Sequence, residues 1–91
     1  MIKVITKTGF EIEVSENVMN DMEVVDAIAA CDSTEEFEKI KGISMLCKKV
    51  FGKDCKRVYD HVRTDDGRVP PDLLEKEILD VFDAFGKEGK N

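Results

Sequence analysis

Apolar and polar residues alternate along the first fourteen positions, which is the period-two pattern of a half-buried antiparallel β-hairpin. Between the two runs lies Lys7-Thr8-Gly9, which suits a three-residue hairpin loop with glycine in the left-handed conformation. The register then places Val4 opposite Ile12 and Ile2 opposite Val14 on one face. Because a lone two-stranded hairpin is marginally stable in water, we expect this apolar face to cover helices or a partner.

From residue 20 onward the pattern becomes helical. Capping-box sequences beginning at Asn20 and at Ser33 predict two helices. Gly42 lies inside the second helix, where we expect a break or a close contact, and Gly52 is expected to end that helix. The apolar positions predicted to face inward are Met22, Val25, Ile28 and Ala29 in the first helix, and Phe37, Ile40, Ile43, Cys47 and Val50 in the second.

Two more helices follow in the prediction. Asp54 is expected to cap a short helix, and "TDDGRVPP" is expected to form a turn. Pro71 suits the first position of a last amphipathic helix that ends at Gly86. The sequence therefore predicts one domain over residues 1–91 of the α+β class, mostly α. It consists of an N-terminal two-stranded antiparallel β-hairpin (2–14), about four helices in a compact bundle (20–86) and a frayed polar tail (87–91).

The formal net charge of −6 is unevenly distributed along the chain. Residues 10–38 include ten acidic and no basic side chains, whereas residues 39–63 include eight basic and two acidic ones. The basic segment could contact phosphate groups, but the protein is acidic overall and shows no recognition-helix motif, so we expect a protein contact rather than a nucleic-acid contact. Charge complementarity between copies in a homo-oligomer is a further alternative. The basic patch predicted from this segment comprises Lys48, Lys49, Lys53, Lys56 and Arg57.

Residues with typical catalytic or metal-binding spacing are not evident. His61 is the only histidine, and no serine or cysteine has a base partner close in sequence. Cys31, Cys47 and Cys55 lack the C-x2-4-C spacing of a structural zinc site. No signal peptide or membrane-spanning run is visible, which indicates a cytoplasmic protein with reduced thiols. We therefore expect a protein that is not an enzyme and has no cofactor, metal or membrane partner.

The order of the predicted elements resembles the small tail assembly chaperones of long-tailed bacteriophages and prophages, particularly those of Gram-positive hosts. The matching stretches are "TGFEIEV", "NDMEVVDAIAACD", "VFGKDCKRVYDHV", "DDGRVP" and the final amphipathic helix. The resemblance implies a non-enzymatic role in the host bacterial cytoplasm. Such a protein would bind the hydrophobic, helical tape measure protein and help tail tube subunits to assemble around it.

That role requires an exposed apolar groove or helix face. The predicted partner-binding residues are Phe10, Ile12, Phe51, Tyr59, Phe82 and Phe85, with Phe37 and Val50 as further candidates and Met22 and Met45 as adaptable neighbours. Each of them could instead be core, and Phe51 and Phe85 are favoured because they lie near helix ends. The alternative function is a small acidic adaptor or regulatory domain, associated with nucleic acid through residues 39–57. Steep salt dependence of binding would identify that alternative.

Overall fold

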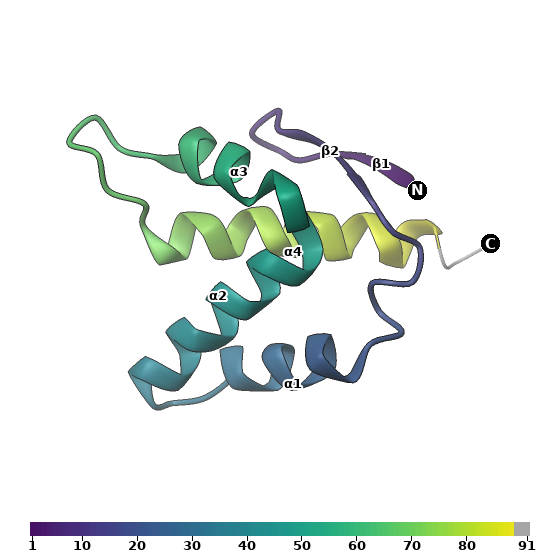
Figure 1. The fold of residues 1–91 in the computed structure, drawn as a ribbon, viewed down its shortest axis with the longest axis horizontal. Helices are drawn as coiled ribbons and strands as arrows, with labels where there is room; N and C mark the ends of the chain where they lie inside the picture. The colour runs from purple at the N-terminus through teal and green to yellow at the C-terminus, as the bar shows by residue number, and fades with distance from the viewer. Residues whose placement is uncertain (89–91) are drawn as a thin grey trace.

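The computed structural model describes residues 1–88 and is mostly helical, with an N-terminal antiparallel hairpin, as predicted (Figure 1). Its elements are β1 (Ile2–Ile5), β2 (Glu11–Val14), α1 (Met22–Cys31), α2 (Glu36–Phe51), the 3-10 turn η1 (Gly52–Asp54), α3 (Cys55–Val62) and α4 (Pro71–Glu88). Because α2, η1 and α3 follow one another without a loop, the helical residues form three continuous segments. The predicted count of about four helices differs slightly from this.

The hairpin has the predicted register, with Val4 opposite Ile12 and Ile2 opposite Val14. Its loop is closed by two backbone hydrogen bonds, from Thr6 N–H to the Phe10 carbonyl and from Gly9 N–H to the Thr6 carbonyl, both 2.9 Å. Gly9 has a φ of 88°, a conformation that glycine adopts without steric cost. The loop chemistry and the alternating pattern therefore specify the same pairing.

Figure 1 shows α4 running through the middle of the molecule, with the hairpin and α3 on one side of it and α1 on the other. Helix α2 crosses between them and packs on α1 and on α4. Every helix and both strands contribute to one hydrophobic core. The apolar face of the hairpin thus covers helices of its own chain. The buried apolar residues are Val4, Phe10, Ile12, Val14, Val18, Val24, Ala27, Ile43, Leu46, Cys47, Val50, Phe51, Val58, Leu74, Ile78 and Val81.

The inward face of α1 differs from the prediction. Val24 and Ala27 are buried, whereas Met22 is 66% exposed and Val25 is 44% exposed. The helix also begins one residue later than expected, because the Asp21 carboxylate accepts the hydrogen bond from Glu23 N–H at 2.9 Å. This helix is apolar on nearly every side, so its period alone does not select the face that packs.

Gly42 makes the close contact that its position in α2 predicts. A Cβ atom built there would lie 2.8 Å from the Ala27 carbonyl oxygen and 2.9 Å from both Ala30 Cβ and Cys31 N. The backbones of α1 and α2 approach each other at this point, which decides the packing face of α1. The helix start predicted from the capping box at Ser33 was wrong by two residues. The Glu35 carboxylate caps α2 by accepting hydrogen bonds from the N–H groups of Phe37 and Glu38.

The predicted ends of the later helices are partly correct. Gly52 ends α2 with a φ of 50°, and Pro71 opens α4. Asp54 makes no side-chain cap to α3, and its carboxylate instead pairs with Arg57 at 3.0 Å. Helix α4 continues through Gly86 to Glu88, so the predicted end at Gly86 was wrong, and only residues 89–91 of the predicted tail lie outside the described residues. None of the helices within residues 1–88 is sufficiently long and apolar to cross a membrane.

Candidate protein-binding surface

Three of the predicted partner-binding residues are core residues. Phe10, Ile12 and Phe51 are at most 5% exposed, and the rings of Phe10 and Phe51 meet edge to face with centroids 5.9 Å apart. Phe51 turns inward because the chain bends at Gly52 and folds α3 back along the hairpin. The expectation that these three side chains are open to a partner is therefore corrected. Phe82 and Phe85 are half-buried against the same core.

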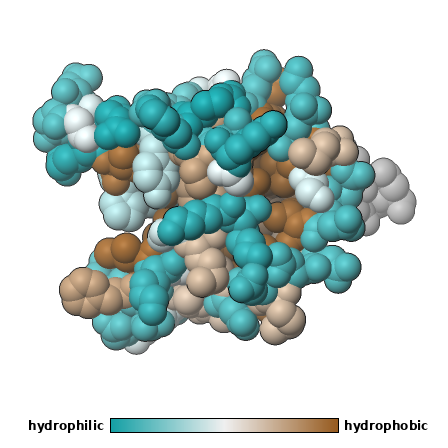
Figure 2. Space-filling model, viewed as in Figure 1, coloured by the Kyte–Doolittle hydropathy of each residue, from teal (hydrophilic) through white to brown (hydrophobic). Residues whose placement is uncertain are grey.

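The open aromatic side chain is Phe37, in the first turn of α2. It is 76% exposed, and Ile40, one turn further along, is 40% exposed. The apolar stripe of α2 thus begins before the point where other elements cover it. Figure 1 shows the start of α2 projecting at the lower left, and Figure 2 shows apolar surface at that end of the molecule.

An apolar pocket continues from this exposed end of α2. It has a volume of about 250 Å³ and lies between α2, α3 and the start of α4. Tyr59 is the predicted candidate that lines it. Burial, with the neighbouring Cys47 and Cys55, raises the pKa of the Tyr59 phenol. The residues that line the pocket are Ile40, Ile43, Ser44, Tyr59, Val69, Pro71 and Leu74.

Charged side chains of both signs lie beside Phe37. Glu35, Glu36 and Glu38 flank it directly, and all three are exposed. Lys39 and Lys41 follow, and Lys41 lies one helical turn from Phe37. The three carboxylates can pair with lysine or arginine of a partner that also presents an apolar side chain to Phe37. We name the surface formed by Phe37, Ile40 and the pocket the α2 surface.

The predicted basic patch is largely neutralised. The Lys49 ammonium contacts Asp21 at 3.1 Å and Glu23 at 2.5 Å, and Lys56 pairs with Asp60 at 3.0 Å. The hydrogen bond from Lys49 holds the pKa of Asp21 below its usual value.

Arg57 is also engaged within the chain. It pairs with Asp54, donates to the Glu11 carbonyl oxygen at 3.0 Å and lies 4.8 Å from the centroid of the Phe10 ring. Three of the five residues in the predicted patch, Lys49, Lys56 and Arg57, are therefore paired within the chain. Lys48 and Lys53 are exposed and have no ion-pair partner among residues 1–88. The five residues thus do not form a continuous free cationic surface for phosphate groups.

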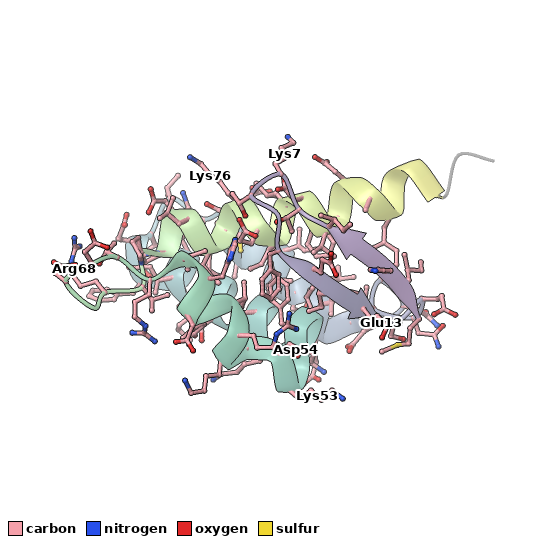
Figure 3. The ribbon with its side chains drawn as sticks, turned by 90° about the horizontal axis from the view of Figure 1, so that it is seen from above. Lys7, Glu13, Lys53, Asp54, Arg68 and Lys76 are labelled. Atoms are coloured by element: carbon pink, nitrogen blue, oxygen red, sulfur yellow. The ribbon has the colours of Figure 1, made fainter. Side chains whose placement is uncertain are left out.

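A wider trough of about 1020 Å³ lies between β2 and the end of α2. Figure 3 shows Glu13 on β2 and Lys53 and Asp54 near η1 along this side of the molecule. Acidic and basic side chains line the trough in equal number, so its charge favours neither an anionic nor a cationic partner. The acidic side chains are Glu11, Glu13, Asp21 and Asp54, and the basic ones are Lys3, Lys49, Lys53 and Arg57.

A buried polar cluster holds the hairpin loop against α4. The Glu77 carboxylate, 1% exposed, accepts hydrogen bonds from the hydroxyl groups of Thr6 at 2.9 Å and Thr8 at 2.8 Å. His61 Nε2 lies 2.8 Å from Thr8 Oγ1, and because the Thr8 proton points to the carboxylate, the imidazole donates to that oxygen. The cluster therefore fixes the loop in place.

A backbone contact strengthens this attachment. Lys7 N–H, at the tip of the hairpin in Figure 3, donates to Asp80 Oδ2 at 2.9 Å. This cluster was not predicted from the sequence. Its signal was Glu77 itself, an acidic residue on the apolar face of α4 next to Ile78 and one turn from Leu74 and Val81.

Comparison of the chain with protein-family models, with curated proteins and with solved structures found no match. Within the described residues, no group of three or more histidine, cysteine, aspartate or glutamate side chains is arranged to hold a metal ion. The α2 surface, which combines the exposed Phe37 with an apolar pocket, is the candidate protein-binding surface.

Proposed function

We propose that this protein is a non-enzymatic interaction protein, a tail assembly chaperone of the phage type. It binds a helical, hydrophobic segment of a tape measure protein during tail morphogenesis. The observation that carries the binding role is the exposure of Phe37 beside the apolar pocket. The phage assignment is supported by the resemblance in the order of elements and the matching sequence stretches.

Binding of a helix in a groove is the mode that suits the α2 surface. An amphipathic helix would insert an apolar side chain between Ile40, Tyr59 and Leu74, which line the pocket. The same helix would bury Phe37 at the centre of the contact, and basic residues on the rim of that helix would pair with Glu36 and Glu38. A buried aromatic side chain at the centre of an interface commonly contributes about 2 kcal/mol or more. Removing Phe37 should therefore weaken binding by at least about thirtyfold.

The first experiment is to sequence the DNA downstream of the gene and to co-express the protein with the long, coiled-coil-rich product expected there. The protein should increase the soluble yield of that product. Phe37→Ser should abolish the increase while leaving the melting temperature unchanged, because the side chain is exposed. Leu79→Ser is the matched control, since Leu79 is also exposed and apolar but lies on α4 outside the pocket.

Two results would contradict the proposal. One is a Phe37→Ser variant that solubilises the product as well as the wild-type protein does. The other is tight DNA binding that weakens steeply with salt, which would favour an acidic adaptor or regulatory domain acting through residues 39–57.

A further inference from the structure

Two thiols meet where α2 passes into α3. The Sγ atoms of Cys47 and Cys55 are 3.5 Å apart, and the Cys55 thiol donates a hydrogen bond to the Cys47 carbonyl oxygen at 3.2 Å. Cys47 is buried and Cys55 is partly exposed, and both are free thiols. The pair is unlike Cys31, which lies on α1 and packs against the core on its own.

We propose that Cys47 and Cys55 are a site of reversible thiol oxidation, at which an intramolecular disulfide joins α2 to α3. A disulfide bond is about 2.05 Å long, so the two sulfur atoms have to approach by about 1.5 Å. The proposal rests on the contact between the two sulfurs and is independent of the proposed function.

The difference in exposure sets the order of the chemistry. The Cys55 thiolate, the more accessible of the two, attacks a small disulfide such as oxidised glutathione and releases one glutathione thiolate. The Cys47 thiolate then attacks the Cys55 sulfur of the mixed disulfide and releases the second glutathione. Two cysteine thiols are oxidised, and one glutathione disulfide is reduced to two thiols.

Burial raises the pKa of the Cys47 thiol, and the hydrogen bond with Cys55 adds to this effect. The fraction of thiolate at Cys47 is therefore small at neutral pH, which slows the second step. We expect closure of the disulfide to accelerate as the pH rises from about 7 to about 9. The mixed disulfide on Cys55 should accumulate first at the lower pH.

The bond would join two walls of the pocket in the α2 surface. Cys47 lies one helical turn after Ile43 on α2, and Cys55 lies one turn before Tyr59 on α3. Both thiols also influence the phenol of Tyr59, consistent with their proximity to it. Oxidation therefore acts on the spacing of these two helices.

The test is incubation of the folded protein with an excess of oxidised glutathione, followed by acid quenching, alkylation with N-ethylmaleimide and peptide mass mapping. Two of the three free thiols should disappear, a linked Cys47–Cys55 peptide should form, and the remaining alkylation should map to Cys31. Cys31→Ser should oxidise in the same way, whereas Cys47→Ser should stop at the glutathione adduct of Cys55. Dithiothreitol should restore all the thiols.

The proposal is overturned if the native wild-type protein keeps three free thiols while the same protein oxidises in urea. It is also overturned if the linked peptide contains Cys31. Because the peptide map of the wild-type protein alone decides between these outcomes, the test holds even if Cys47→Ser, at a buried position, fails to fold.

Discussion

Replacing Gly42 by alanine should destabilise the protein although alanine is the better helix former. In an exposed helix interior the substitution would add about 1 kcal/mol of stability. Here the new methyl group would lie 2.8 Å from the Ala27 carbonyl oxygen and 2.9 Å from Ala30 Cβ and Cys31 N. Ordinary contacts of this kind begin at 3.4 Å, so α1 has to move away by about 0.6 Å, the difference between 3.4 and 2.8 Å.

Two of the three atoms belong to the backbone of α1, and a side-chain rotation cannot relieve the contact. The helix has to shift as a unit, which loosens the packing of Val24 and Ala27. Overpacking of this kind costs about 1–3 kcal/mol, which exceeds the gain in helix propensity. Because the contact is mainly with backbone atoms, we expect a cost in the upper part of this range, about 2–3 kcal/mol. Subtracting about 1 kcal/mol of helix propensity leaves a net loss of about 1–2 kcal/mol. Each kcal/mol lowers the melting temperature of a domain of this size by roughly 4–8 °C.

Thermal and urea unfolding followed by circular dichroism would measure the effect. Gly86→Ala is the matched control, because Gly86 also lies in a helix but has no atom within 4 Å of the position of its Cβ. This control should be as stable as the wild-type protein or slightly more stable. If Gly42→Ala were equally stable, the close approach of α1 and α2 would have no energetic importance, and the reasoning would be refuted.

Two further predictions concern polar groups. Glu77→Ala removes the acceptor of two hydroxyl hydrogen bonds and should lower the free energy of unfolding in urea by about 1–3 kcal/mol. Glu77→Gln should lose less, because glutamine keeps the packing and one acceptor oxygen; equal losses would show that neither of these contributes to stability. The second prediction concerns acid. The hydrogen bond from Lys49 lowers the pKa of the Asp21 carboxyl from its ordinary 3.8. The stability that the ionised carboxylate contributes is therefore complete above about pH 4 and is lost as the pH falls through the lowered pKa. The urea midpoint of the wild-type protein should therefore fall more steeply below about pH 4 than that of Asp21→Asn, and parallel curves would rule out a contribution from this pair.

The elements that the sequence predicted well are those specified by local chemistry. Gly9 and Gly52 have positive φ angles that few other residues adopt, and the fixed φ of Pro71 suits the first position of a helix. These positions set the register of the hairpin, the end of α2 and the start of α4. Their conformations depend on the residue itself more than on distant contacts.

The prediction failed where the burial of a side chain depended on the positions of neighbouring elements. Phe37 and Phe51 both lie near an end of α2, and both fit an apolar stripe. Only the position of α3 and the hairpin, which cover the second half of α2 and leave the first turn open, distinguishes the core residue from the exposed one. The same holds for α1, whose packing face was set by the missing side chain of Gly42 on α2.

The attachment of the hairpin to Glu77 has a consequence for the order of folding. Thr6 and Glu77 are 71 residues apart, so a hairpin that is synthesised early is held in place by a helix that is synthesised late. At a synthesis rate of about 5–20 residues per second, the apolar face of the hairpin waits roughly 4–15 s for residues 15–88. During that interval the hairpin has few native contacts, because its covering helices are not yet complete. Long-range closure of this kind makes folding a single late event, and chains released before Glu77 should be preferred substrates for cellular proteases.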